Sequence, residues 1–307
     1  MIRAETLAKR FGDKIAVDGI SFQVEAGEIY GLLGPNGAGK TTTLSMISGL
    51  LAPDSGRITF DGIELASEPI RFKQRLGVVP QDVALYEELT AIENVRFWGS
   101  LYGLSGKALA DAADRALANV ELSGRARDAV KTYSGGMKRR LNLALGLVHS
   151  PTGVLLDEVT AGIDPQARAS ILELVRGVAA AGAAVIYTTH YLEEAERLCD
   201  RIGIMDHGRI LAEGTPSELK ARLGEEEVVT LWGRFEADAA QAALAGIPGT
   251  RVLSADAGKV ALSAGERGAA GLLAEIYQGG LAIDRVAIEP PSLNALFLRL
   301  TGRELRD

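Results

Sequence analysis

The sequence is poor in cysteine and histidine, with one cysteine, Cys199, and three histidines among 307 residues. It therefore has no internal disulfide and no Cys/His cluster with metal-binding spacing. It also lacks the run of about 18 apolar residues that a membrane-spanning helix requires. The nearest run, residues 178–189, is shorter and is interrupted by Gly182. The N-terminus has no apolar core of a signal peptide, so we expect a soluble protein in a reducing compartment.

Basic residues are not in excess, since 33 Lys and Arg face 40 Asp and Glu and give a net charge of −7. This balance excludes a surface built to coat a polyphosphate, and we expect no nucleic-acid partner. A hydrophobic share of 47% and a charged share of 24% are those of a globular protein. The length predicts two domains, and the chain contains no repeat and no heptad run.

Short apolar runs rich in Val and Ile alternate with longer helical patterns, which predicts an α/β fold with a largely parallel sheet. The expected strands are residues 27–33, 57–60, 76–79, 153–156, 184–187 and 201–205. A helix is expected over residues 39–51. Residues 90–120 are helical in pattern and rich in Ala and Leu, so we expect a helical subdomain, about residues 82–150, inserted into the α/β core.

The pattern changes after residue 222, where the polar stretch 224–227 resembles a linker. Beyond it the expected order is strand, helix, two strands, helix and strand. That βαββαβ order predicts a small ferredoxin-like α+β unit. The expected domains are therefore residues 1–222 and residues 223–307.

A glycine-rich segment, residues 34–41, matches the phosphate-loop pattern G-x-x-x-x-G-K-[ST] between an expected strand and an expected helix. Backbone N–H groups of such a loop point inward and the helix N-terminus adds partial positive charge. Lys40 would reach the β- and γ-phosphates, and the Thr41 hydroxyl would bind Mg²⁺. By chance, roughly 0.01 matches to this pattern are expected per chain of this length and composition.

Two carboxylates, Asp157 and Glu158, end the apolar run that begins at residue 153. Asp157, at the strand's end, would hold Mg²⁺ from the side opposite Thr41. Glu158 is one residue further and faces another way, so it is free to polarise a water that attacks the γ-phosphate. A strand that ends in two solvated acids is common by itself, but not 117 residues after a phosphate loop.

A third motif lies just upstream, where Tyr133 and Ser134 precede Gly135, Gly136 and an expected helix over residues 137–148. Ser134 is a good N-cap, and the glycines form a second anion cradle. The motif resembles the signature of the ABC-transporter ATPase family. The resemblance covers about residues 2–222 and implies a head-to-tail dimer, in which this cradle binds the γ-phosphate of ATP held by the partner's phosphate loop.

The resemblance assigns further positions one by one. Phe11 matches the aromatic residue that stacks on adenine, Gln81 the glutamine that contacts Mg²⁺ and water, and His190 the histidine that contacts the γ-phosphate. Asp164 matches a residue that contacts the partner subunit, and as a helix N-cap before a proline it can do both. By the residues alone, Phe11 could equally be a core aromatic, Gln81 a surface residue and His190 structural. The resemblance implies that ATP is bound by Phe11, Asn36, Gly37, Ala38, Gly39, Lys40, Thr41, Thr42, Ser134, Gly135, Gly136 and Asp164, that Mg²⁺ is bound by Thr41, Gln81 and Asp157, and that catalysis rests on Glu158, His190, Gln81 and Lys40.

Only one position departs visibly from the family pattern, because Val159 stands where the family usually has proline after the catalytic glutamate. Both carboxylates remain, so we expect an active ATP hydrolase. Residues 289–298 resemble the C-terminal motif of exporter-type ATPases that have separate membrane subunits, including drug and antibiotic exporters.

The resemblance thus implies the ATP-hydrolysing subunit of an exporter of a drug, lipid or polysaccharide, held on the cytoplasmic membrane face by permease subunits. These would dock near residues 81–102, where Tyr86 and Trp98 are expected to line the surface and Phe97 to pack inside. The alternative is a soluble ATPase of the same superfamily in translation or DNA repair. Such relatives usually have two cassettes, a coiled-coil insertion or a basic surface, none of which this sequence shows.

Overall fold

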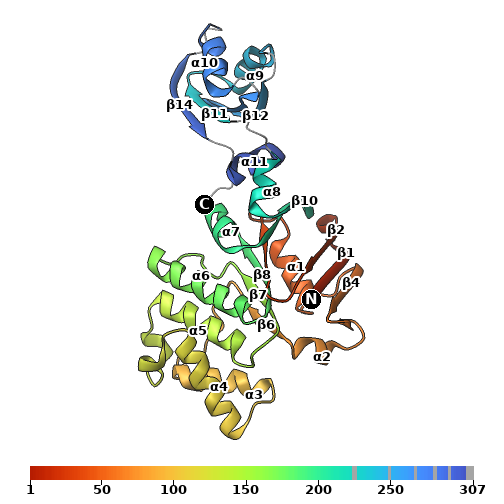
Figure 1. The fold of residues 1–307 in the computed structure, drawn as a ribbon, viewed down its shortest axis with the longest axis vertical. Helices are drawn as coiled ribbons and strands as arrows, with labels where there is room; N and C mark the ends of the chain where they lie inside the picture. The colour runs from red at the N-terminus through yellow and green to blue at the C-terminus, as the bar shows by residue number, and fades with distance from the viewer. Residues whose placement is uncertain (223–226, 248–249, 266–267, 279–281, 290–291, 302–307) are drawn as a thin grey trace. The chain divides into compact units, whose positions relative to one another are not determined.

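The computed structural model describes residues 1–222, 227–247, 250–265, 268–278, 282–289 and 292–301 (Figure 1). The chain divides into two compact units, Met1–Ile210 and Leu211–Asp307, and the division falls inside strand β10 (Arg209–Gly214). Four of the residues expected to form a linker or its edge, 223–226, lie outside the described residues, so the domain boundary at 222 stays a prediction. Among the described residues no helix is both long and apolar enough to cross a bilayer.

The first unit begins with an antiparallel sheet in the order β2-β1-β4-β5. Its strands are β1 (Ile2–Phe11), β2 (Lys14–Val24), β4 (Ser55–Phe60) and β5 (Ile63–Glu64). The first two form a hairpin in which Phe11 pairs with Lys14, and Gly12 takes φ +57° at the first turn position. Of its strands only β4 was predicted from the sequence, over residues 57–60.

The central sheet has the order β10-β9-β3-β8-β7-β6. Its other strands are β3 (Ile29–Leu33), β6 (Leu76–Val79), β7 (Gly153–Asp157), β8 (Ala184–Thr189) and β9 (Arg201–Asp206). From β9 to β6 all strand pairs are parallel, which confirms the predicted α/β core. Leu33 lies beside Thr189 and Asp157 beside Thr188, so the carboxyl ends of these strands meet at one edge. In open α/β sheets this edge is where ligands bind.

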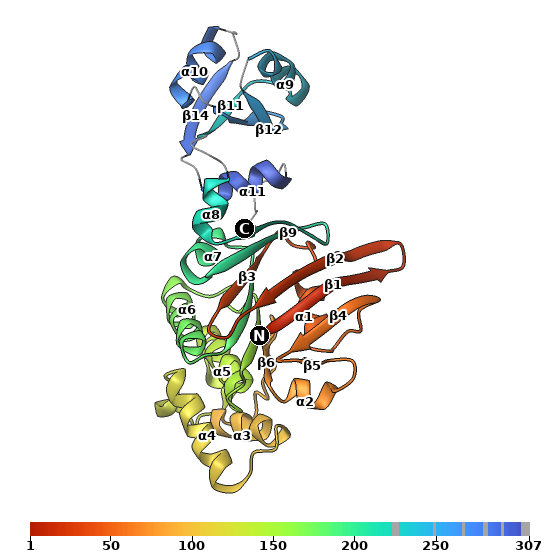
Figure 2. The ribbon, with the colours of Figure 1, turned by 45° about the vertical axis from the view of Figure 1, so that its right-hand side comes forward.

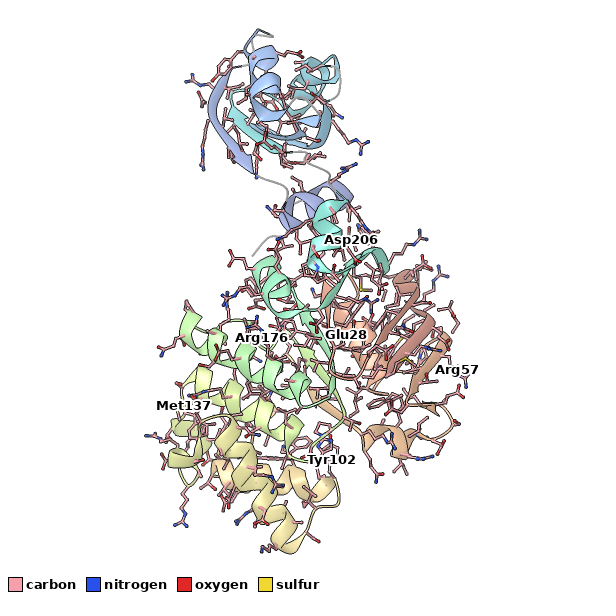
Figure 3. The ribbon with its side chains drawn as sticks, in the orientation of Figure 1. Glu28, Arg57, Tyr102, Met137, Arg176 and Asp206 are labelled. Carbon is pink, nitrogen blue, oxygen red and sulfur yellow. The ribbon has the colours of Figure 1, made fainter. Side chains whose placement is uncertain are left out.

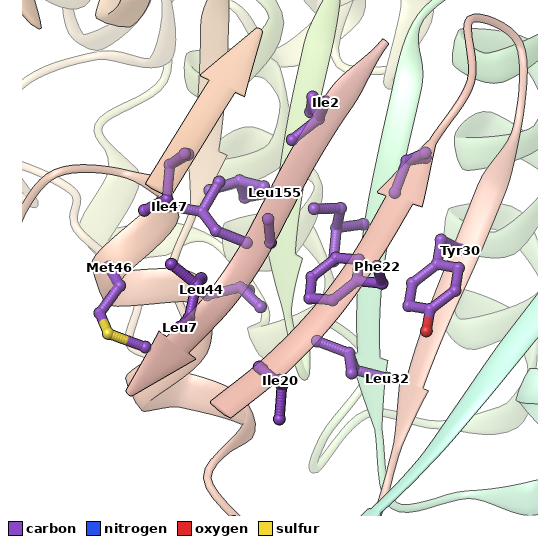
Figure 4. Packing of buried hydrophobic residues seen from close by; sticks show 14 of the residues in the cluster. Ile2, Leu7, Ile20, Phe22, Tyr30, Leu32, Leu44, Met46, Ile47 and Leu155 are labelled. Carbon is purple, nitrogen blue, oxygen red and sulfur yellow. The ribbon is translucent and has the colours of Figure 1, made fainter. Parts of the chain in front are cut away.

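Helices cover both sides of the central sheet (Figures 1 and 2). They are α1 (Lys40–Ile47), α2 (Pro69–Lys73), α5 (Gly135–Leu147), α6 (Pro165–Ala180) and α7 (Leu192–Leu198). On one side α1 and the antiparallel sheet pack on the central strands, in a core that includes Leu7, Phe22, Tyr30 and Leu155 (Figure 4). The rings of Phe22 and Tyr30 stack with centroids 4.9 Å apart.

The predicted helical subdomain consists of α3 (Ala91–Leu101), α4 (Gly106–Asn119), two short 3₁₀ turns (Ser123–Arg125 and Val130–Thr132) and the start of α5. Thr90 starts α3 with a capping box, because its hydroxyl accepts from the backbone N–H of Glu93 while the Glu93 carboxylate accepts from that of Thr90. Figure 2 shows α3 and α4 side by side next to α5. They share a core of their own, which includes Val95, Leu117 and Leu145.

The second unit contains a four-stranded antiparallel sheet in the order β12-β13-β11-β14. Its elements are α8 (Pro216–Ala221), β11 (Val228–Gly233), α9 (Ala237–Ala245), β12 (Arg251–Asp256), β13 (Lys259–Ser263), α10 (Gly268–Gln278), β14 (Ile283–Glu289) and α11 (Leu293–Thr301). Leu231 and Leu262 of the sheet form a core with Leu244 of α9 and Leu272 of α10. The family-like tail contains α11, which Ser292 caps, while its Pro290 and Pro291 lie outside the described residues.

Candidate nucleotide-binding site

The glycine-rich loop connects β3 to α1 at the carboxyl edge of the central sheet. Gly39 is the N-cap of α1 and has φ +110°, a conformation that side chains rarely tolerate. A Cβ atom on Gly34 would lie 2.2 Å from the Met205 carbonyl oxygen, and one on Gly39 would lie 2.4 Å from that of Ala16. The chain therefore needs glycine at both positions to bring its backbone N–H groups around one point, as an anion-binding loop requires.

Lys40 is the first residue of α1 and is buried, with 4% of its side chain exposed. Its ammonium group donates to the carbonyl oxygens of Gly34 at 2.6 Å and Pro35 at 3.2 Å. It also forms an ion pair with Glu158, with Nζ 3.1 Å from Oε1. A buried cation with carbonyl partners inside a glycine-rich loop is suited to bind phosphate oxygens.

Glu158 follows β7 and has φ +44°, an uncommon backbone conformation for a residue with a side chain. Its N–H lies 3.1 Å from the Thr188 hydroxyl and 3.2 Å from the Thr188 carbonyl, both of which accept from it. The same hydroxyl donates to Asp157 Oδ1 at 2.6 Å. Thr188, which the sequence did not single out, therefore holds the Asp157 carboxylate and the Glu158 backbone where β7 and β8 end.

Three predicted groups surround the Glu158 carboxylate. Besides the Lys40 ammonium at Oε1, His190 Nδ1 lies 3.1 Å from Oε2, and the Gln81 amide donates to the same oxygen at 3.4 Å. His190 follows β8 and Gln81 follows β6 by two residues, so adjacent parallel strands deliver all these side chains to one edge. Such a carboxylate, flanked by a cation and two polar groups, can orient a water and accept its proton.

A cavity of ≈ 380 Å³ lies beside the loop, and Asp157 and His190 are not among its lining residues. Its lining contains Phe11, Asn36, Gly37, Ala38, Gly39, Lys40, Thr41, Thr42, Gln81 and Glu158 from the predicted set, together with Lys14 and Ala16. Phe11 is half exposed, at 50%, so its ring face is available for stacking. Lys14 and Ala16 belong to β2, the strand that the sequence pattern did not reveal.

A second cavity, of ≈ 310 Å³, is lined by Ser134, Gly136 and Asp164, three of the other predicted residues. Ser134 caps α5 by accepting from the Met137 N–H at 3.3 Å. Asp164 caps α6 by accepting from the N–H groups that follow it at 3.1 and 3.0 Å. Two helix N-termini thus open into one cavity, whose lining shares no residue with that of the first; Figure 3 labels Met137 at the start of α5. Gly135 is exposed and is not among the lining residues.

The aromatic residues of α3 differ from the prediction. Phe97, expected to pack inside, is 40% exposed and meets Tyr86 edge to face at 5.0 Å. Trp98 instead packs against the core of the helical subdomain, and its indole N–H is buried. Successive residues of a helix differ by about 100° in direction, so the neighbouring rings face different surroundings. Tyr86 is 49% exposed and stays a candidate docking residue.

A buried carboxylate, Glu194, was also missed. One of its oxygens accepts from three hydroxyl groups, those of Thr160, Tyr187 and Thr189, at 2.9, 2.7 and 2.9 Å. Burial, with the Glu194 charge, raises the pKa of Tyr187 well above its usual value. These hydroxyls flank the Glu158 and His190 segments, so the network braces both. The one signal for it in the sequence is a buried strand that ends in Tyr-Thr-Thr.

This arrangement defines a P-loop ATPase with an inserted helical subdomain. It combines a glycine-rich loop, a buried lysine and paired carboxylates at the edge where the parallel strands end. The sequence profile of the family described as "ABC transporter" matches residues 17–161. The chain is 46% identical, over all of both chains, to the linearmycin resistance ATP-binding protein LnrL of Bacillus subtilis (strain 168). It is 42% identical to the Nod factor export ATP-binding protein I of Burkholderia lata, covering 97% of this chain and 96% of that one.

Among solved structures, one titled "Structure of ATP binding subunit of ABC transporter" superposes with a TM-score of 0.67 at 32% identity. It covers 73% of this chain and 93% of the other. The chain therefore belongs to the ABC transporter ATP-binding proteins, and it is an ATP-binding ATPase of the group that contains the exporter subunits. This confirms the family, the activity and the P-loop α/β fold that the sequence predicted.

Proposed function

We propose that two copies of this chain close head to tail on two ATP molecules and thereby drive an exporter. The observation that carries the proposal is the separation of the two cavities. The cavity beside Lys40 holds the hydrolytic groups but no residue of the Ser134 motif, and the cavity beside Ser134 holds two capped helix N-termini but no lysine of a phosphate loop. Each is half of a nucleotide site, and a second copy supplies the other half.

The residues of the Lys40 cavity fit ATP as substrate. The loop N–H groups and Lys40 bind the β- and γ-phosphates, and the exposed ring of Phe11 stacks on adenine. A hydroxyl, a carboxylate and an amide oxygen are the hard donors that Mg²⁺ takes, and Thr41, Asp157 and Gln81 provide them. When bound, the metal would neutralise charge that develops between the β- and γ-phosphates.

Hydrolysis rests on Glu158. With ATP bound, the Lys40 ammonium is expected to exchange its Glu158 partner for phosphate oxygens, which leaves the carboxylate free to accept a proton from the attacking water. His190 and Gln81 already lie beside that carboxylate and would orient the water and the γ-phosphate. Product release reopens the dimer, because ATP stabilises the closed state more than the separated products do.

The work is delivered to permease subunits in the membrane. The names of the relatives, linearmycin resistance and Nod factor export, support export of a drug, lipid or polysaccharide. We place the docking surface on residues 81–102, where Tyr86 and Phe97 are exposed. The chain would then work at the cytoplasmic face of the membrane, held there by its partners.

We assign the second unit to the ferredoxin-like class. Its order of elements is βαββαβ, and the outer strand β14 lies next to β11, the first strand. All of its strand pairs are antiparallel, as in that class. A role in stabilising or regulating the dimer fits a unit whose described residues contribute nothing to the lining of either cavity.

A mixing experiment tests the dimer. Lys40→Ala damages the loop half of a site and Ser134→Arg blocks the other half, so each variant alone is expected to be inactive. In a head-to-tail heterodimer both defects fall in one site and the other site is intact, so an equal mixture should regain about a quarter of the wild-type ATPase rate. A mixture no more active than either variant would show that each copy completes its own site.

A further inference from the structure

Helix α5 packs, from residue 138 to residue 146, against the segment 77–87, which carries Gln81. Near the end of α5, Gly146 contacts β6 so closely that a Cβ atom there would lie 2.5 Å from a Val79 methyl group. From the β6 side, a Cβ atom on Gly77 would lie 2.2 Å from the Gly146 carbonyl oxygen. The two backbones therefore touch, because glycine faces glycine.

Asn142, one turn closer to the start of α5, is a buried amide with 3% of its surface exposed. Its oxygen accepts from the Ala84 N–H at 3.2 Å and its nitrogen donates to the Pro80 carbonyl at 3.4 Å. The amide thus holds the chain on both sides of Gln81. A buried amide with these two partners is costly to remove, since backbone groups would lose hydrogen bonds away from water.

Arg139 lies one helical turn further toward the start of α5, and its guanidinium donates to the carbonyl oxygen of Gln81 itself. The neighbouring Lys138 forms an ion pair with Glu87, with Nζ 2.5 Å from Oε1. Residue 142 is spaced i,i+3 from residue 139 and i,i+4 from residue 138, so it neighbours both on the side of α5 that meets the segment. This side holds residues 80–84 through their backbone groups and Glu87 through its side chain.

The same helix begins at Ser134, which lines the second cavity, while the Gln81 side chain donates to Glu158 in the first. We propose that Arg139 and Asn142 are positioning residues for Gln81, which fix its backbone to α5 and set its amide against Glu158. A rigid helix gripped in this way carries any displacement of its first turn to Gln81. The proposed function has the partner's ATP bind at Ser134. On that basis, binding there would shift α5 and so move Gln81 relative to Glu158 in the same copy.

The test is a double-mutant cycle between Arg139 and Gln81 in the full-length protein. Arg139→Met keeps the aliphatic part of the side chain and removes the donor, and Arg139→Lys restores a charged donor. We expect Arg139→Met to lower kcat about tenfold with the KM for ATP changed less than about twofold, and Arg139→Lys to recover most of that loss. In a Gln81→Ala background, Arg139→Met should have no further effect on kcat.

A matched control is Arg71→Met, which removes an exposed arginine paired with Glu68 on α2. It should leave kcat and KM unchanged. Asn142→Ala is the second arm and should lower kcat with the same loss of effect in the Gln81→Ala background, measured at a temperature well below its midpoint of unfolding. An undiminished effect of Arg139→Met in that background, or a loss confined to KM, would overturn the assignment.

These outcomes are separable from those of the proposed dimer. The cycle is measured on kcat and needs Arg139 to act through Gln81, whichever copy completes the site. The mixing experiment tests whether a second copy completes the site, and its only substitution at α5 is at the N-cap, Ser134. Restored activity in the mixture together with additive effects in the cycle would retain the dimer and reject the role of Arg139 and Asn142.

Discussion

The two cavities of the first unit differ in the chemical groups that line them. The one beside Lys40 concentrates charge, because a buried ammonium, two carboxylates and a histidine converge where parallel strands end. The one beside Ser134 is lined by two helix N-termini with their caps, together with Glu121 and Arg140, and contains neither the phosphate-loop lysine nor Glu158. On the proposed function, the first would cleave the phosphoanhydride bond and the second would hold the γ-phosphate of the partner's ATP, so the two would be complementary.

The largest effect is expected from Glu158→Gln, which should nearly abolish hydrolysis at the Lys40 cavity without loss of ATP binding. Removal of the base should lower kcat about a hundredfold or more, while the loop still binds ATP and the dimer persists, because the products that weaken it do not form. Steady-state ATPase rates and sedimentation in the presence of ATP measure both effects. Turnover near the wild-type rate would remove Glu158 from the role of base.

The opposite loss is expected from Lys40→Ala. This variant removes the buried cation that faces the phosphates, so the dissociation constant for ATP should rise about thirtyfold. Isothermal titration on the purified protein measures it, and Glu158→Gln serves as the control that retains affinity. Equal affinity in the two variants would contradict the assignment of Lys40 to the phosphates.

A smaller effect is expected at the proposed docking surface, where a substitution should change the affinity for the permease and not the affinity for nucleotide. Phe97→Ala removes an exposed ring that contacts Tyr86, and the affinity for the permease should fall about fivefold with nucleotide affinity unchanged. Trp98→Ala is the comparison, since that ring packs on the subdomain core and its loss should lower the midpoint of unfolding instead. A fall in ATP affinity with Phe97→Ala would argue against a separate docking surface.

The smallest effect concerns His149, which lies outside both cavities and stacks on Tyr102 with ring centroids 3.5 Å apart. Burial lowers its pKa to about 4, from a usual value of 6.5. The unfolded chain therefore takes up this proton first as the pH falls, and stability is lost between about pH 6.5 and pH 4.

The variant His149→Phe keeps a ring for the stack and removes this titration. Between pH 7 and pH 5 its free energy of unfolding should fall by about 1 kcal/mol less than that of the wild type, because the ring is only partly buried. Urea unfolding at the two pH values measures the difference. Parallel pH profiles would show that His149 does not titrate with folding.

The sequence revealed what local patterns encode. The strand 76–79 was predicted at the bounds that the structure shows, and β7 and β8 extend one and two residues further, to Asp157 and Thr189. The phosphate-binding residues could be recognised from the sequence, because phosphate binding needs fixed residue types at fixed spacing. They are the glycines of the loop, Lys40 and the two carboxylates.

Other features could not be read because they depend on distant partners. Strands β1 and β2 escaped notice, since much of each is exposed and polar, and with them Lys14 and Ala16 of the cavity lining. Thr188 and Glu194 act through hydrogen bonds across 30 or more residues, or with several partners at once, which no local pattern reveals. The orientation of Phe97 and Trp98 was set by packing against α4 and α5 rather than by hydrophobicity.

The contact between Gly77 and Gly146 leaves no room for even a methyl group. A natural variant with alanine at either position would spread β6 and α5 apart and tilt the Gln81 segment, although every atom that touches the nucleotide would keep its identity. ATP hydrolysis would then fail in a protein whose predicted ATP-binding residues are all intact, and a mutational survey confined to those residues would overlook it.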